Sequence, residues 1–170
     1  MSFPSLAFSS RTRQANGAKR AFSLVELVIV IVIIGVLAAI AVPRLSRGAT
    51  TASENALSAN LAAMRSAVEL FYAEHAQTYP ALAKFEDALT KYSDAAAANF
   101  GDRNAATGII YGPYLRAVPP LPVGAKKGKT AAVAALGEDG GWVYDATKGT
   151  VSANCADAEV DTNGKKYNTY

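Results

Sequence analysis

One stretch near the start of the chain differs from everything after it in its pattern of apolar and polar positions. Residues 22 to 42 read FSLVELVIVIVIIGVLAAIAV, and Glu26 is the only charged residue among them. As an α-helix, 21 residues at 1.5 Å per residue span about 31 Å, enough to cross the hydrocarbon core of a bilayer. Because the run is apolar all round, it is not one face of a surface helix. The pattern predicts a membrane-spanning helix.

From Arg44 onward, apolar residues recur on one side only. They are spaced by four and three positions, as on one stripe of an α-helix, at Leu57, Leu61, Met64, Val68 and Phe71. Polar residues fill the other faces, namely Glu54, Asn60, Arg65 and Glu69. The pattern therefore predicts an amphipathic helix that buries one side.

Few helix breakers separate the apolar run from the amphipathic stretch. Pro43 is the strong one between Phe22 and His75, and Gly35 is a softer one. We therefore expect one long helix that is kinked near Pro43 and ends near Gln77, because Pro80 disfavours helix at the residue before it. A membrane anchor followed by a separate helix is the alternative.

The rest of the chain predicts a small mixed domain. Pro80 suits the first turn of a second helix, in which Leu82, Phe85, Leu89 and Tyr92 keep the helical spacing until a stop at residues 99–101. Short β-like runs follow at 109–111, 142–145 and 150–153, and the last two flank a turn in which Gly149 stands where φ is positive. The Pro-rich residues 119–122 are extended and cannot lie in a central strand.

These patterns predict an α+β fold, with a long N-terminal helix packed on a small C-terminal antiparallel β domain. The expected parts are a leader at 1–21, a membrane-spanning half-helix at 22–43, an amphipathic half-helix at 44–77 and a globular head at 78–170.

The charge distribution separates the leader from the remainder. Of the 17 basic residues, four lie in the first 21 positions, which hold no acid: Arg11, Arg13, Lys19 and Arg20. The other 149 residues therefore hold 13 basic and 14 acidic side chains, so no nucleic-acid partner is expected. Only Arg44 and Arg47 follow the span closely, and this asymmetry predicts a cytoplasmic N-terminus.

Glu26 is unusual for a plain anchor, since an acid at the centre of a membrane helix costs about 2.5–3.5 kcal/mol on insertion scales, and less near an end. A positive group at the same depth would offset that cost. If the chain were cut before Phe22, the new α-amine would be such a group, four residues from Glu26 on the same helix or on a neighbouring copy.

With its basic leader, Phe22-Ser-Leu-Val-Glu26-Leu and the apolar run, the chain resembles the type IV pilins and the pseudopilins of type II secretion. Gly35 and Pro43 also stand where that family places a glycine and a proline, which implies a role in helix flexibility. The resemblance implies cleavage between Ala21 and Phe22 by a prepilin peptidase, N-methylation of Phe22, and assembly in which Glu26 takes part. The implied partners are further copies of the chain, the peptidase, the membrane and an inner-membrane assembly platform.

Two features depart from the family pattern. Ala21 stands where the family usually has glycine before the cut, and Cys155 has no second cysteine with which to close the C-terminal disulfide loop of many type IV pilins. The second departure favours pseudopilin-like or less elaborated pilins.

Two other readings of the N-terminus stay open. Ala39-Ile-Ala41 after an apolar run fits a secretory signal peptide, although Glu26, the length of the run and Pro43 oppose it. A single membrane anchor that carries a periplasmic domain explains every feature except Glu26.

The enzymatic signals are weak, and we expect no catalytic residue. Gly124-Ala-Lys-Lys-Gly-Lys-Thr130 has three residues between its glycines where a phosphate loop needs four, so it predicts a solvated basic loop. His75 is expected to be a packed or half-exposed helix residue, and Cys155 a small buried residue or a free thiol.

No cofactor is expected, apart from a possible calcium site. Asp157, Glu159, Asp161 and Asn163 gather oxygen ligands before Gly164, a fragment of a calcium-loop pattern, and some major pseudopilins bind calcium in this region. An ordinary polar tail is the alternative.

Overall fold

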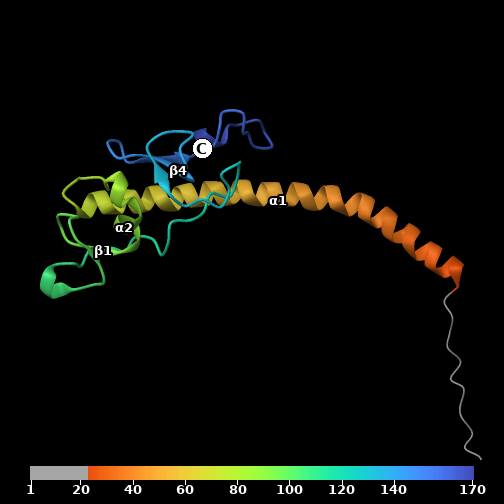
Figure 1. Cartoon of the computed structure of the whole chain (residues 1–170), viewed down its shortest axis with the longest axis horizontal. Helices are drawn as coiled ribbons and strands as arrows, with labels where there is room; N and C mark the ends of the chain where they lie inside the picture. Colours follow the sequence, from red (N-terminus) through yellow and green to blue (C-terminus); the bar gives the residue numbers. More distant parts are fainter. Residues whose placement is uncertain (1–22) are drawn as a thin grey trace, which may run out of the picture. The chain divides into compact units, whose positions relative to one another are not determined.

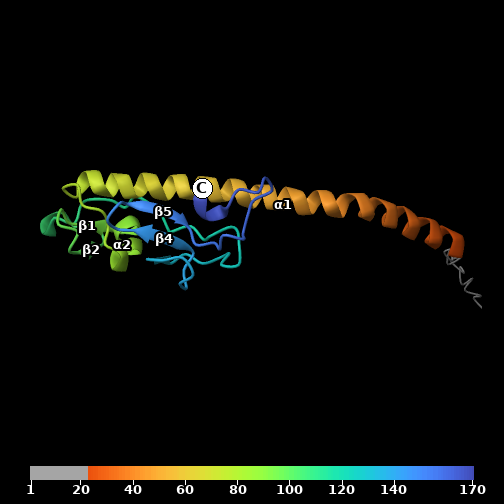
Figure 2. The same cartoon turned by 90° about the horizontal axis from the view of Figure 1, so that it is seen from above.

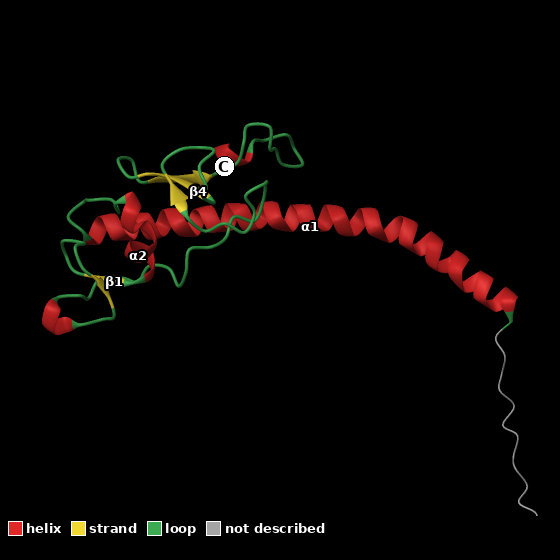
Figure 3. Ribbon diagram, in the orientation of Figure 1, coloured by secondary structure: helices red, strands yellow, loops and turns green. Residues whose placement is uncertain are grey.

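The computed structural model describes residues 23–170, apart from the side chains of Pro43 and Ser46. The described residues divide into two units on either side of the Val42–Pro43 bond. Helix α1 (Leu24–Glu74) runs through both without interruption. Figure 3 shows the second half of this helix beside the short strands and the long loops of the second unit. The expected α+β fold, a long N-terminal helix with a small C-terminal β domain, is confirmed.

Other elements of the second unit pack against the second half of α1. The predicted stripe is confirmed, because all five of its residues, Leu57, Leu61, Met64, Val68 and Phe71, are at most 1% exposed. Figures 1 and 2 show β4 and β5 lying along this part of the helix. Trp142, Tyr144 and Val151 of these strands join Leu57, Leu61, Met64 and Val68 in one hydrophobic core.

The predicted hairpin is confirmed at the predicted residues. Strand β4 (Trp142–Asp145) pairs antiparallel with β5 (Thr150–Ala153), and Trp142 lies opposite Ala153. The turn residue Gly149 has φ +68°, as its position indicated. A third strand, β3 (Ala132–Val133), pairs parallel with β4 and makes the sheet mixed. The sequence did not predict β3, because two residues are too few to show the alternation of apolar and polar side chains that marks a strand.

The end of α1 and the start of the next helix differ from the prediction. Helix α1 ends at Glu74, three residues early, and Ala76 and Gln77 then adopt left-handed backbone angles. Pro80 does not open a helix, because a 3₁₀ turn, η1 (Leu82–Lys84), begins two residues later and leads into α2 (Phe85–Thr90). The buried Pro80 instead offers its carbonyl oxygen to the hydroxyl of Tyr144, at 2.9 Å.

The second helix is also much shorter than its apolar spacing predicted. Tyr92, expected on the helix, lies in strand β1 (Tyr92–Ser93), which pairs with β2 (Phe100–Gly101). Lys91 is already extended, and the backbone of Ser93 bonds to Tyr111. These pairings replace helical bonds and end α2 nine residues before the predicted stop. The predicted strand at 109–111 is present only as isolated bridges at Ile109 and Tyr111.

The basic and Pro-rich loops follow the prediction. Residues 119–122 lie outside any strand, and the carbonyl oxygen of Pro119 accepts a hydrogen bond from the Trp142 indole at 2.8 Å. Lys127 and Lys129 are exposed in the following loop. Two further 3₁₀ turns, η2 (Ala105–Thr107) and η3 (Tyr167–Thr169), complete the described elements.

Candidate assembly segment

The first half of α1 carries a continuous apolar surface. Its large apolar residues, from Leu24 to Val42, are between 42% and 79% exposed, and they lie on all sides of the helix. Among residues 23–170, α1 is the one helix that is long and apolar enough to cross a membrane. Such a surface is stable only when lipid or other apolar helices cover it.

Glu26 lies in the first turn of this apolar helix. The position favours a negative charge, because the unpaired N–H groups at a helix N-terminus carry a partial positive charge. The side chain is exposed, and it makes no hydrogen bond or salt bridge within the part of the chain that the structure describes. Its charge is therefore available for a partner outside that part.

Gly35 and Pro43 also lie within α1. A Cβ atom at Gly35 would meet nothing within 4 Å, so contacts inside the described chain do not require glycine there. Helix flexibility at these two positions, and the kink near Pro43, stay predictions. Ala21 and Phe22, the predicted cleavage residues, lie outside the described residues.

Comparison with known families identifies this segment. The model of the prokaryotic N-terminal methylation motif matches residues 16–42, which include the end of the predicted leader, Phe22, Glu26 and the whole apolar run. The chain carries a prepilin-type segment. No curated protein and no solved structure matches the chain significantly. The assignment therefore rests on the motif and on the long apolar helix, and it is consistent with anchoring in the inner membrane.

The remaining candidates lie in the second unit, at a distance along the chain from the prepilin-type segment. His75 is packed, at 2% exposure: its Nδ1 lies 2.8 Å from the Phe71 carbonyl oxygen and its Nε2 lies 2.9 Å from Ser93 Oγ. Because a carbonyl only accepts, Nδ1 donates to Phe71, and in a neutral imidazole Nε2 then accepts from the Ser93 hydroxyl. The imidazole thereby ties the end of α1 to β1, as a structural residue would.

Cys155 is buried, at 1% exposure, as expected for a small buried residue. Burial, and then the nearby Glu159 carboxylate, raise the pKa of its thiol to about 11. A thiol of this kind is largely protonated near neutral pH and reacts slowly.

The acidic residues of the possible calcium site bind separate donors. Asp157 pairs with Lys166 and Asn168, whereas Glu159 accepts from the backbone of Ala125 and Ala156. Asp161 accepts from two backbone N–H groups of its own loop. Within residues 23–170, no three His, Cys, Asp or Glu side chains converge on one point.

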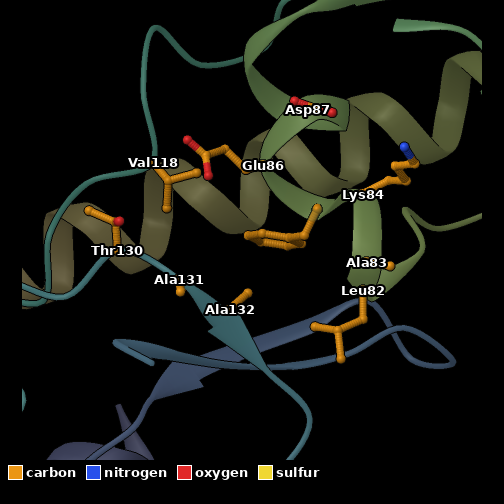
Figure 4. A pocket seen from close by; sticks show the side chains of 10 residues that line it. Leu82, Ala83, Lys84, Glu86, Asp87, Val118, Thr130, Ala131 and Ala132 are labelled. Carbon is orange, nitrogen blue, oxygen red and sulfur yellow. The ribbon is translucent and has the colours of Figure 1, made fainter. Parts of the chain in front are cut away.

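A pocket of about 260 Å³ lies between the η1–α2 segment and β3, as Figure 4 shows. Its polar lining comes from Lys84, Glu86, Asp87 and Thr130, and Asp87 is paired with Lys91 at 2.7 Å. The lining brings together none of the predicted site residues. The prepilin-type segment, rather than this pocket, is the part of the chain that points to a function.

Proposed function

We propose that the chain is the structural subunit of a type IV pilus-like or type II secretion pseudopilus filament. The observation that carries the proposal is the methylation motif at residues 16–42, which lies on a helix whose apolar surface is exposed on all sides. A prepilin peptidase removes residues 1–21 between Ala21 and Phe22 and methylates the new amine. The motif supports a structural subunit rather than an enzyme.

In this proposal, the two halves of α1 have different environments. Before assembly the apolar half spans the inner membrane, with the N-terminus in the cytoplasm and the head in the periplasm. An assembly platform then extracts the subunit, and apolar helices of neighbouring copies replace the lipid around it. The exposed apolar residues of α1 support this exchange, since lipid and helices can cover the same surface.

Glu26 and the α-amine of Phe22 are the proposed assembly pair. In the membrane, the carboxylate lies close to the headgroups, where a charge is tolerated. Among packed helices it would lose water, and a desolvated charge is stable only when it is paired. The amine exists only after cleavage, so processing would create the contact that assembly needs.

The experiment compares cells with and without the chain by electron microscopy, together with the intact mass of membrane-purified protein. The proposal expects a mature chain that starts at methylated Phe22 and fibres that disappear in the deletion strain. Loss of an exported enzyme without surface fibres assigns the chain to a secretion pseudopilus.

The alternative function is a membrane-anchored or exported periplasmic domain that does not polymerise. It predicts a chain that starts at Met1 if the helix is a plain anchor, or at Val42 if residues 1–41 are a signal peptide. Either start contradicts the filament proposal.

A further inference from the structure

Glu54 is buried although it is charged and the sequence predicted an exposed residue there. Its spacing, three residues before Leu57 and seven before Leu61, continues the buried stripe of α1. It is 7% exposed, and its Oε1 and Oε2 accept hydrogen bonds from the backbone N–H and the hydroxyl of Thr162, at 2.9 and 3.0 Å. The Tyr167 hydroxyl donates a third bond at 3.4 Å. A buried carboxylate is tolerated because such donors replace water, and all three donors come from one segment near the C-terminus.

We call that segment, residues 156–170, the strap. Its apolar contribution to the core is two tyrosines: Tyr167 is buried in the core and Tyr170 packs partly buried against it, and Asp161 is the buried polar residue among the described residues of the strap. Most of the other strap residues are exposed. Segments with few buried apolar contacts open at lower free energy than the core does. Polar bonds, those to α1 among them, are therefore a large part of what holds the strap in place.

A second residue of α1 holds the far end of the strap. The Arg65 guanidinium donates to the carbonyl oxygen of Tyr170 at 2.6 Å and to that of Val151 on β5 at 2.9 Å. Glu54 and Arg65 are separated by about three helical turns, so they project from the same side of α1. Inside the strap, Asp161 accepts from the N–H groups of Asn163 and Lys165, which shapes the loop that presents Thr162 to Glu54.

The only cysteine of the chain lies directly under the start of the strap. Cys155 is 1% exposed, its carbonyl oxygen accepts a bond from Asn168 of the strap at 3.2 Å, and its thiol adjoins the strap residue Glu159. Displacement of the strap would remove these contacts and expose the sulfur, while β4 and β5 keep their own ladder and core.

We infer that residues 156–170 form a noncovalent strap that Glu54 fastens to α1, and that the strap opens, without unfolding of the sheet, to uncover Cys155. The inference is independent of the proposed filament role, because it concerns the head alone. It assigns to Glu54 the contact that fastens the loop of the C-terminal segment, while Arg65 holds its far end, in a chain that has no second cysteine.

The test uses the full chain in detergent micelles and a maleimide probe, which reports on the single thiol. Glu54→Ala should raise the labelling rate of Cys155 by about tenfold or more, because the Thr162 and Tyr167 donors lose their buried acceptor. Glu54→Gln should change it less, since an amide can still accept from the Thr162 N–H and donate to its hydroxyl. Asn55→Ala, at an exposed neighbouring position, is the matched control and should leave the rate unchanged.

Backbone hydrogen exchange on the same variants separates strap opening from unfolding. The inference expects that Glu54→Ala loses protection at residues 156–170 while β4 and β5 stay protected. Unchanged labelling and exchange would overturn it, and so would loss of strap and sheet protection together. If Glu54→Ala does not fold, Thr162→Val, which removes only the hydroxyl bond, is judged by the same criteria.

Discussion

The hydroxyl of Tyr144 donates a hydrogen bond to the carbonyl oxygen of Pro80, at 2.9 Å, and so joins the central strand of the sheet to the connection that follows α1. Tyr144 is 1% exposed, and its ring centroid lies 4.4 Å from that of Phe85. Burial raises the pKa of this hydroxyl, because the phenolate would lose its water there. The bond therefore fixes the chain reversal between α1 and α2 from the inside of the head.

Replacement of Tyr144 by Phe should lower the free energy of unfolding by about 1–3 kcal/mol, because the Pro80 carbonyl is left buried without a donor. Denaturant unfolding of the full chain in detergent measures the difference. Tyr92→Phe is the control, since Tyr92 is half-buried and donates no hydrogen bond within residues 23–170. Equal stability of the two variants would contradict this account of the bond.

Gly149→Ala should destabilise the protein more strongly than Tyr144→Phe does, through the hairpin of β4 and β5. Gly149 has φ +68°, and a Cβ atom there would lie 2.3 Å from the Tyr79 ring. The left-handed backbone costs a non-glycine residue roughly 1–2 kcal/mol, and overpacking typically adds about 1–3 kcal/mol. Gly164→Ala is matched in backbone angle, at φ +82°, but its Cβ would meet nothing within 4 Å. Thermal unfolding should show the larger loss for Gly149→Ala, and equal losses would exclude the Tyr79 contact as the cause.

Features that depend on local periodicity could be predicted from the sequence. The stripe from Leu57 to Phe71 predicted the buried face of α1, and the apolar runs around Gly149 predicted β4 and β5. Both signals arise inside one element, where the spacing of side chains alone decides which face is buried. The prepilin-type segment was also predictable, because a charge within an apolar run is locally conspicuous.

Features that depend on distant partners could not be predicted. Tyr92 keeps the helical spacing of α2, but Ser93 beside it bonds to Tyr111, 18 residues later, and the chain becomes a strand. Glu54 was expected to be exposed because it is charged, but Thr162, 108 residues later, supplies the donors that allow it to be buried. At Tyr92 a tertiary hydrogen bond outweighs a helix preference of a few tenths of a kcal/mol per residue, and at Glu54 tertiary hydrogen bonds replace the water that a buried carboxylate loses.

The strap should respond to pH through Asp161 and Tyr170. The Tyr170 hydroxyl donates to the Asp161 carboxylate and lowers the pKa of that carboxyl, so this stabilisation is present above the ordinary pKa and is lost as the pH falls through the lower folded value. The same bond raises the pKa of Tyr170 to about 12, so its stabilisation is present below the ordinary value of about 10 and is lost as the pH rises toward 12.

Chemical shifts of the Asn163 and Lys165 amides, followed against pH, measure both transitions, the acid limb and the alkaline limb of the titration curve. They should be constant between about pH 5 and pH 9 and change on either side. Tyr170→Phe should remove the alkaline limb and move the acid limb toward the ordinary carboxyl value, because the donor to Asp161 is lost. Asp161→Asn should abolish the acid limb. Limbs that persist unchanged in both variants would assign the titration to other groups.

The charge asymmetry predicts a head on the periplasmic side of the inner membrane. Lys127 is exposed in the head, so Lys127→Cys in a Cys155→Ser background provides one accessible thiol. A membrane-impermeant maleimide should label it in cells whose outer membrane alone is permeabilised, to the level reached after complete lysis. Labelling that requires lysis of the inner membrane would reverse the proposed topology.

Glu26→Gln should separate insertion from assembly. The amide has the shape of the carboxylate but no charge, so the variant should insert and be cleaved as well as the unmodified chain, or better, since it places no ion in the apolar span. It should enter filaments poorly, because an amide cannot neutralise the α-amine of Phe22 on a neighbouring copy once both are desolvated. Glu26→Asp, which keeps the charge on a side chain one methylene shorter, should impair assembly less, and Val30→Leu should leave it intact.

Counts of fibres per cell and the intact mass of the membrane pool measure assembly and cleavage independently. If Glu26→Gln builds filaments in normal number, the amine is not the partner, and the carboxylate must serve a step before assembly; if it blocks cleavage, that step is recognition by the peptidase.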